Sequence, residues 1–178
     1  MHEIPPDIRQ MAAAVELLAM DVDGVLTGGE IIYGPGGEWK VFSVKDGHGF
    51  RLAARAGLKT AVITGRRSHV VLVRARELGV FAVLQGVTDK GRAIEELCVK
   101  QGIGLNAVCF VGDDLVDLPV MRRVGFPVAV ADAVEEVQAA ARWITPSAGG
   151  RGAVREVIEL LLKARGQWDS ILRQYYEE

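Results

Sequence analysis

Residues 15–27 read VELLAMDVDGVLT, an apolar run that ends in two aspartates and a glycine. The run has the length and composition of a strand buried on both faces of a parallel sheet. Side chains alternate along a strand, so Asp21 and Asp23 point the same way at its carboxyl end while Val22 turns into the core. Ligands of open α/β sheets bind at such ends. The stretch predicts a functional site there, with solvated strand-end aspartates as the plain alternative.

Strand-like apolar runs alternate with helix-period segments along the rest of the chain. Strands are expected at 58–64, 80–84, 107–113, 127–131 and 143–144. Helices are expected at 47–56, 68–78, 89–101, 115–124, 134–141 and 153–164. One β-hairpin interrupts the alternation between Leu26 and Val44, where EIIYG and EWKVFSV flank a Gly-Pro-Gly-Gly turn. The order predicts an α/β fold with a doubly wound, Rossmann-like parallel sheet and a hairpin inserted after the first strand.

The bulk properties exclude several classes of protein. With 178 residues we expect a single domain over 1–166 and a C-terminal tail over 167–178. A net charge of -2 with interspersed signs argues against a nucleic-acid binder. The sequence has no run of about eighteen apolar residues, so no membrane span is expected. Cys98 and Cys109 have no CxxC partner and the first residues do not read as a secretory signal, so we expect reduced, buried thiols in a cytoplasmic protein.

A second acidic cluster follows another apolar run. Asp113, Asp114 and Asp117 come directly after AVCFVG. In a doubly wound sheet this strand end lies beside the first, so the two groups of carboxylates converge. Oxygen ligands without histidine or cysteine suit Mg²⁺, which prefers carboxylates, waters and substrate phosphate. The sequence therefore predicts a Mg²⁺ site.

Groups that can hold a phosphate follow two other strands. Thr64 ends one run, and Gly65 exposes a backbone N–H at the start of the next helix, where anions are favoured. Lys90 follows a later strand and loop. Alone, such a threonine is usually a cap and such a lysine is usually solvated. The order DxD, Thr, Lys and GDDxxxD, each after a strand, predicts a phosphoryl-transfer site.

These parts define a reaction. Ionised Asp21, beside Mg²⁺ and Lys90, attacks phosphorus as a nucleophile. Asp23 protonates the leaving alcohol and then acts as a base on the water that hydrolyses the aspartyl phosphate. Mg²⁺ and Lys90 offset charge on the equatorial oxygens. The predicted catalytic residues are Asp21, Asp23, Thr64 and Lys90.

The motifs DVDGVLT, ITGR, DK and GDDLVDLP resemble the four motifs of the haloacid dehalogenase superfamily phosphatases, over roughly residues 17–130. The roles that this resemblance implies are metal ligands at Asp21, Asp23 (through its backbone carbonyl) and Asp113, phosphoryl contacts at Thr64 and Lys90, and an orienting residue for the lysine at Asp117.

VKDGHGFR at 44–51 and GGRGAVREV at 149–157 extend the resemblance to one subfamily, the phosphatases of 3-deoxy-D-manno-octulosonate (KDO) 8-phosphate. It implies hydrolysis of that sugar phosphate to KDO and phosphate, in lipopolysaccharide precursor synthesis. Lys45 stands where an arginine is frequent, and His48 where an aromatic or apolar residue is expected. The implied substrate contacts are Asp23, Ser43, Val44, Lys45, Asp46, Gly47, Arg51, Arg66, Arg74 and Lys90.

The intervals between the motifs leave no room for a cap domain. Residues 21–64 hold only the hairpin and one helix, and residues 64–90 hold one helix and one strand. An open site would expose the intermediate to excess water. The resemblance implies a homotetramer in which neighbouring subunits cover the site, with the hairpin and the GGRGAVRE segment as candidate contacts.

Three alternatives stay open at this point. A phosphoacceptor receiver module also combines Asp, Mg²⁺, Thr and Lys on a parallel sheet, although it needs no acid at the position of Asp23. A phosphatase of a nonulosonic acid 9-phosphate or another sugar phosphate would carry the same motifs. An inactive scaffold would keep the fold, but intact acids at every motif position argue against it.

Overall fold

The computed structural model describes residues 4–177, so positions 1 and 178, the outer limits of the predicted domain and tail, lie outside the described residues. The main sheet has the strand order β5-β4-β1-β6-β7-β8, and its pairings are parallel. Its strands are β1 (Leu17–Met20), β4 (Lys59–Thr64), β5 (Ala82–Gln85), β6 (Val108–Gly112), β7 (Phe126–Ala129) and β8 (Trp143–Ile144). The chain runs outward from β1 to one edge and then from β6 to the other, which confirms the doubly wound sheet.

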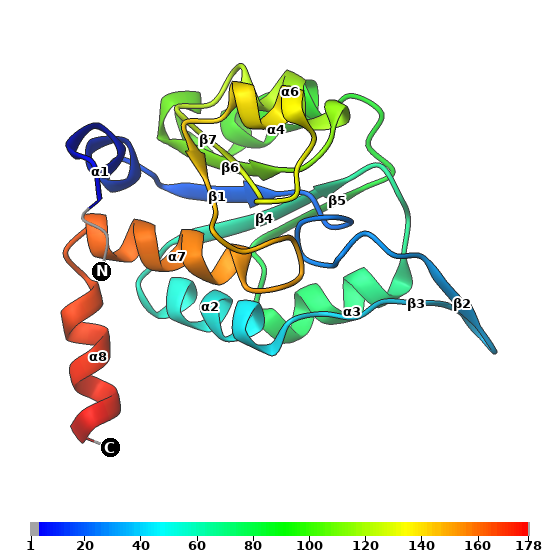
Figure 1. The fold of residues 1–178 in the computed structure, drawn as a ribbon, viewed down its shortest axis with the longest axis horizontal. Helices are drawn as coiled ribbons and strands as arrows, with labels where there is room; N and C mark the ends of the chain where they lie inside the picture. Colours follow the sequence, from blue (N-terminus) through cyan, green and yellow to red (C-terminus); the bar gives the residue numbers. More distant parts are fainter. Residues whose placement is uncertain (1–3, 178) are drawn as a thin grey trace.

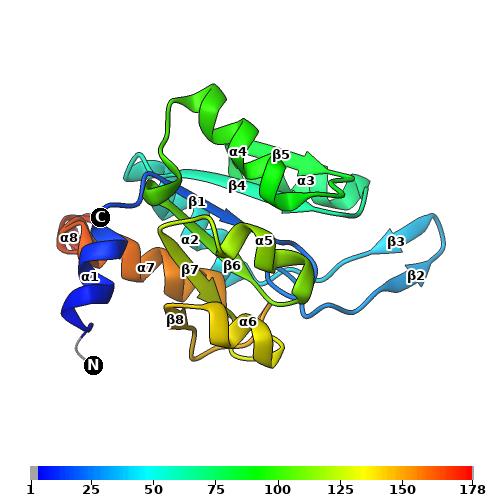
Figure 2. The same cartoon turned by 90° about the horizontal axis from the view of Figure 1, so that it is seen from above.

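Helices cover both faces of this sheet (Figures 1 and 2). Figure 1 shows α2 (Val44–Arg55), α3 (His69–Leu78) and α7 (Ala153–Ala164) on one face. The other face carries α4 (Lys90–Gln101), α5 (Leu118–Met121) and α6 (Glu135–Ala140). Two further helices, α1 (Pro6–Ala13) and α8 (Trp168–Glu177), lie at the end of the molecule opposite the hairpin.

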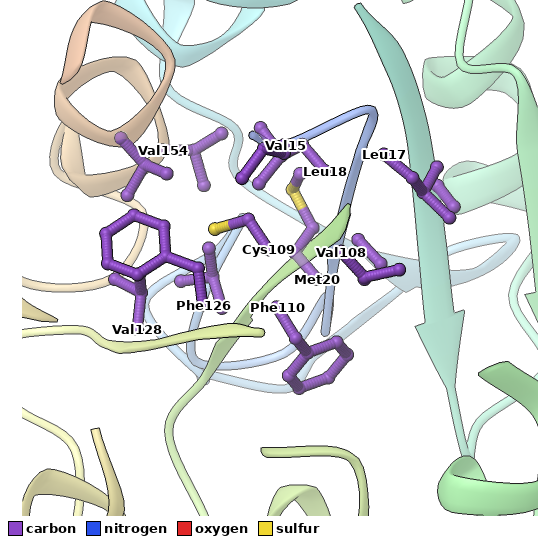
Figure 3. Packing of buried hydrophobic residues seen from close by; sticks show 14 of the residues in the cluster. Val15, Leu17, Leu18, Met20, Val108, Cys109, Phe110, Phe126, Val128 and Val154 are labelled. Carbon is purple, nitrogen blue, oxygen red and sulfur yellow. The ribbon is translucent and has the colours of Figure 1, made fainter. Parts of the chain in front are cut away.

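The central strands are buried because helices pack on each side of them. All residues of β1 and β6 are buried, and the side chains of Leu17, Phe110 and Phe126 are among the largest with almost no exposed surface. Figure 3 shows residues of β1, β6, β7 and α7 packed together. Cys98 and Cys109 are free and buried, as predicted, and burial raises the pKa of both thiols.

The predicted hairpin is present as a separate two-stranded antiparallel sheet. It consists of β2 (Ile32–Gly34) and β3 (Gly37–Trp39), and it projects from the body of the molecule (Figures 1 and 2). Within residues 4–177 no further insertion follows β1 or β4, which confirms the absence of a cap domain. No helix in this part of the chain is long and apolar enough to cross a membrane.

Several element boundaries differ from those expected. The helix expected at 47–56 begins at Val44, because the Ser43 hydroxyl caps it by accepting a hydrogen bond from the Asp46 N–H at 3.2 Å. The helix expected at 115–124 is a 3₁₀ turn followed by the short α5, with Pro119 in the first turn as predicted.

The two terminal helices were not predicted from the sequence. α1 begins with Pro6, a residue that favours the first turn of a helix. α8 buries Ile171 against the core, and its Tyr175 hydroxyl lies 3.2 Å from His48 Nε2 and from Arg55 Nη1. The division at residue 166 stays a prediction, since α8 packs on α7 within the same chain.

Candidate active site

The functional residues meet where four parallel strands end. Asp21 follows β1 and Asp113 follows β6, and these two strands are neighbours in register, with Met20 opposite Val111. Thr64 ends β4 on the other side of β1, and Lys90 begins α4 after β5. An open cleft of about 720 Å³ lies over these ends. The predicted residues that line it are Asp21, Asp23, Thr64, Gly65, Arg66, Lys90, Asp113 and Asp114.

Glycines allow the loops at this edge to come close together. Gly24 has a φ of +86°, and a Cβ at this position would lie 2.0 Å from Asp113 Oδ2. Gly149 packs against the same loop so closely that a Cβ there would lie 1.7 Å from the Gly24 carbonyl oxygen. The GGRG segment, predicted as a candidate contact between subunits, therefore also packs against the loop after β1 in its own chain.

Lys90 links the two acidic strand ends. Its ammonium lies 2.6 Å from Asp21 Oδ2 and donates to Asp117 Oδ1 at 2.8 Å, and only 5% of its side chain is exposed. Asp117 is fully buried, and its second oxygen accepts a hydrogen bond from the Asp113 N–H at 3.0 Å. Both Asp117 oxygens are therefore occupied by protein donors, which makes it the residue that orients Lys90.

Burial dominates the electrostatics of this cluster. Burial, opposed by the charge of Lys90, raises the pKa of Asp21 to about 6. Burial, followed by the charges of Asp117 and Asp21, raises the pKa of Asp113 to about 7. Burial alone would lower the pKa of Lys90, but the charges of Asp117 and Asp21 outweigh burial and raise the pKa of Lys90 above its ordinary value. The lysine is thus cationic at neutral pH. Asp21 and Asp113, in contrast, lack enough neighbouring positive charge to keep their pKa values in the usual range of a carboxyl group.

A divalent cation fits this deficit. Oxygens of Asp21, Asp113 and Asp117 lie within 4.8 Å of one another. Three carboxylates against the one ammonium of Lys90 leave two negative charges in a buried group. Asp113 Oδ1 is buried and lacks a hydrogen-bond partner within the described chain. Buried oxygens of this kind are satisfied by a metal such as Mg²⁺, and Asp21 and Asp113 are the side chains positioned to hold it.

Asp23 lies beside this cluster in an ionic network with the hairpin. Its Oδ1 accepts a hydrogen bond from Lys40, and its Oδ2 lies 3.7 Å from Arg66 Nε. Arg66 Nη2 donates to Glu38 Oε1 at 2.6 Å, and Glu38 also lies 3.5 Å from the Lys40 ammonium. Val22, between the two motif aspartates, is fully buried as predicted, but β1 ends at Met20, so the three residues lie in the loop after the strand rather than alternating along it.

The other predicted substrate contacts lie away from the cleft. Residues 43–47 form the N-terminal end of α2, where Asp46 is buried and accepts hydrogen bonds from the Gly152 and Arg155 N–H groups at 3.2 and 2.7 Å. Gly47 lies against Arg74, whose Nε is buried without a hydrogen-bond partner among the described residues. Arg51 is exposed on α2. The structure brings Gly47 and Arg74 together, but in a second group outside the cleft that holds Asp21.

Sequence reasoning missed several residues of the site. Glu38 and Lys40 were interpreted only as part of the hairpin, and Arg123, which lines the cleft, was interpreted only as part of a helix. A charged residue in a hairpin is ordinarily solvated, so no local pattern marks these residues. The contacts of Glu38 and Lys40 with Arg66 and Asp23 depend on how the fold places the base of the hairpin against the loops after β4 and β1.

Comparison with known proteins places this geometry in a family. A model of haloacid dehalogenase-like hydrolases matches residues 69–158. The 3-deoxy-D-manno-octulosonate 8-phosphate phosphatase of Salmonella typhimurium is 45% identical over 167 residues, which cover 93% of this chain and 89% of the relative. The crystal structure of the phosphatase of that name from Moraxella catarrhalis, in complex with magnesium ion, phosphate ion and KDO, superposes with a TM-score of 0.94 at 43% identity, covering 97% and 99% of the two chains.

A cobalt-bound structure of the corresponding Haemophilus influenzae phosphatase superposes with a TM-score of 0.85 at 35% identity, over 88% of this chain and 92% of that chain. The chain belongs to the haloacid dehalogenase-like hydrolases and, within them, to the family of 3-deoxy-D-manno-octulosonate 8-phosphate phosphatases. The resemblance read from the motifs is confirmed, and a phosphatase is favoured over a receiver module.

Proposed function

We propose that this protein is a Mg²⁺-dependent phosphomonoesterase that hydrolyses KDO 8-phosphate to KDO and phosphate. The observation that carries the proposal is the meeting of Asp21, Asp113 and Lys90 at one strand edge. Relatives named as phosphatases of this substrate over nearly the whole chain support it, as does the Moraxella catarrhalis structure with magnesium, phosphate and KDO.

The residues of the cleft divide the reaction into two steps. Asp21 attacks phosphorus, so that an Asp21 O–P bond forms and the ester P–O bond breaks, while Asp23 gives its proton to the departing sugar oxygen. Water then attacks the phosphorus of the aspartyl phosphate and gives a proton to Asp23, while the Asp21 O–P bond breaks and phosphate is released. Asp21 is again a carboxylate and Asp23 is again a protonated acid, ready for the next turnover. Thr64 and Lys90 hold the phosphoryl oxygens. Bound at Asp21 and Asp113, Mg²⁺ supplies positive charge that offsets the charge on those oxygens.

Substrate choice is tested by a panel of phosphate esters with the Mg²⁺-loaded enzyme. We expect kcat/KM for KDO 8-phosphate to exceed that for hexose phosphates by roughly 10³-fold or more, because the sugar carboxylate gives arginines such as Arg66 a charged partner that hexoses lack. A nonulosonic acid 9-phosphate belongs in the same panel. If it, or a hexose phosphate, were hydrolysed with the higher kcat/KM, the proposed substrate would be wrong.

We also propose a homotetramer in which neighbouring copies cover the cleft. Apolar side chains are exposed on the hairpin and at the start of α2, at Ile31, Ile32, Tyr33, Trp39, Val41 and Val44. The predicted substrate contacts outside the cleft, around Gly47 and Arg74, would then serve the site of a neighbouring copy. Light scattering should give four chain masses, and Trp39→Glu should lower that number; a monomeric wild-type protein with full activity would contradict this proposal.

We also propose that the protein works in the cytoplasm. Two buried free thiols agree with the proposed location in the reducing cytoplasm. There the enzyme would supply the sugar acid for lipopolysaccharide precursor synthesis.

A further inference from the structure

Lys40 is a charged residue whose side chain is buried, and the proposed reaction gives it no role. It lies one residue beyond β3, at the base of the hairpin, and its side chain has 0% of its surface exposed. The hairpin strands themselves are largely exposed, with Tyr33 78% and Trp39 54% accessible. A lysine is almost never fully buried unless its charge is paired, so the partners of Lys40 indicate its role.

Those partners lead to the cleft. The Lys40 ammonium donates to Asp23 Oδ1, and Glu38 lies farther away, at 3.5 Å. Asp23 lines the cleft, whereas Lys40 and Glu38 do not. Lys40 therefore contacts Asp23 without lining the cleft itself. Arg66, at 3.7 Å from the other carboxylate oxygen, approaches from the cleft.

The hairpin does not need Lys40 for its own pairing. The backbone pairs of β2 and β3 end at Ile32 opposite Trp39, before Lys40 is reached. Asp23, in contrast, lies in the loop after β1 rather than in a strand, so its carboxylate has no regular structure to hold it. A buried ammonium on one of its two oxygens restricts the rotation of that carboxylate.

We propose that Lys40 is a positioning residue, which holds the Asp23 carboxylate in the orientation from which it transfers a proton to the leaving oxygen. This inference rests on the acid/base role proposed for Asp23. It makes the hairpin a part of the catalytic apparatus within one chain, in addition to its proposed contacts between chains. Proton transfer depends steeply on placement, and a displacement of about 1 Å can cost about 10²-fold in rate.

Leaving groups of different basicity separate this role from a structural one. The leaving group of an alkyl phosphate, such as a sugar phosphate, is a strongly basic alkoxide that needs the proton. The leaving group of p-nitrophenyl phosphate is a stabilised anion that departs without it. We expect Lys40→Met to lower kcat/KM for the sugar phosphate by roughly 10- to 100-fold. The fall for p-nitrophenyl phosphate should stay below about 3-fold. The ratio kcat/KM is the relevant measure because it reports the step in which the ester bond breaks.

Two comparisons identify the cause. Asp23→Asn should show the same selective loss, larger, at roughly 10²- to 10⁴-fold for the sugar phosphate. Adding Lys40→Met to Asp23→Asn should cause no further selective loss, because the two residues act as one unit. Lys100→Met, at an exposed lysine on α4, is the matched control and should change neither substrate.

The outcomes distinguish this inference from the proposed function. Equal losses of kcat/KM for both esters in Lys40→Met, or no loss, would overturn the role of Lys40. If Asp23→Asn itself showed no selectivity for the leaving group, the acid/base assignment would fail first. Lys40→Gln, which keeps a polar group, serves as the second variant if Lys40→Met does not fold, and p-nitrophenyl phosphate hydrolysis in each variant reports an intact site.

Discussion

Asp21→Asn should lose essentially all turnover, by about 10⁵-fold or more, while the protein stays folded. An amide oxygen is a poor nucleophile, and the other carboxylate that contacts Lys90, that of Asp117 at 2.8 Å, is fully buried with both oxygens bound to protein donors. Asp113 also lines the cleft, but its carboxylate is proposed to hold the metal. The measurement is phosphate release with Mg²⁺ present.

The fold should tolerate this change for an electrostatic reason. Burial raises the pKa of Asp21 to about 6, so the folded protein disfavours the charge of Asp21 more than the unfolded chain does. A neutral amide of the same shape removes that cost, and Lys90 keeps Asp117 as a partner. Asp169→Asn, at an exposed acid on α8 that does not line the cleft, is the control and should retain turnover. Normal hydrolysis by Asp21→Asn would refute the nucleophile assignment.

Lys90→Met should reduce both stability and activity. It removes the ammonium that lies between Asp21 and Asp117 and leaves these buried carboxylates without its compensating charge. Breaking a buried ion pair by removing one partner costs about 3–5 kcal/mol, so we expect the free energy of unfolding in metal-free buffer to fall by that amount. Turnover should fall by at least about 10²-fold, because a phosphoryl contact is lost. Urea unfolding and phosphate release measure the two effects.

Lys163→Met is the matched control for this experiment. Lys163 also pairs with a carboxylate, Glu159, at 3.0 Å, but both side chains are partly exposed on α7. Exposed pairs of this kind contribute less than about 1 kcal/mol. Added Mg²⁺ should recover part of the stability of Lys90→Met and leave Lys163→Met unchanged. Equal stabilities of the two variants would show that Lys90 does not compensate the buried acids.

The fold and the centre of the site were predictable from the sequence for a common reason. Buried parallel strands read as continuous apolar runs, and a residue directly after such a run lies at the carboxyl edge of the sheet. Asp21 and Asp113 each follow a strand and Thr64 ends one, so their convergence follows from the sheet alone. The doubly wound order then places β6 beside β1 and brings the second acidic group to the first.

The rest of the site depends on contacts that no local pattern encodes. Lys40 reaches Asp23 only because the base of the hairpin lies against the loop after β1, and hairpin lysines are usually solvated. Asp46 reads as a helix-start acid, and only the packing of α2 on α7 shows that it binds two backbone N–H groups of that segment. α8 was not predicted because a helix of 10 residues is not stable in isolation, and its packing on α7 cannot be read from the sequence.

The covalent intermediate is the most direct test of the reaction. The Mg²⁺-loaded enzyme is quenched in acid during turnover of the sugar phosphate, reduced with borohydride, digested and mapped by mass spectrometry. A reduced aspartyl phosphate, recovered as homoserine, should be found at Asp21 and should be missing from Asp21→Asn. Modification at Asp113 or Asp114 instead, or none at any aspartate during rapid turnover, would contradict the transfer of phosphate through Asp21.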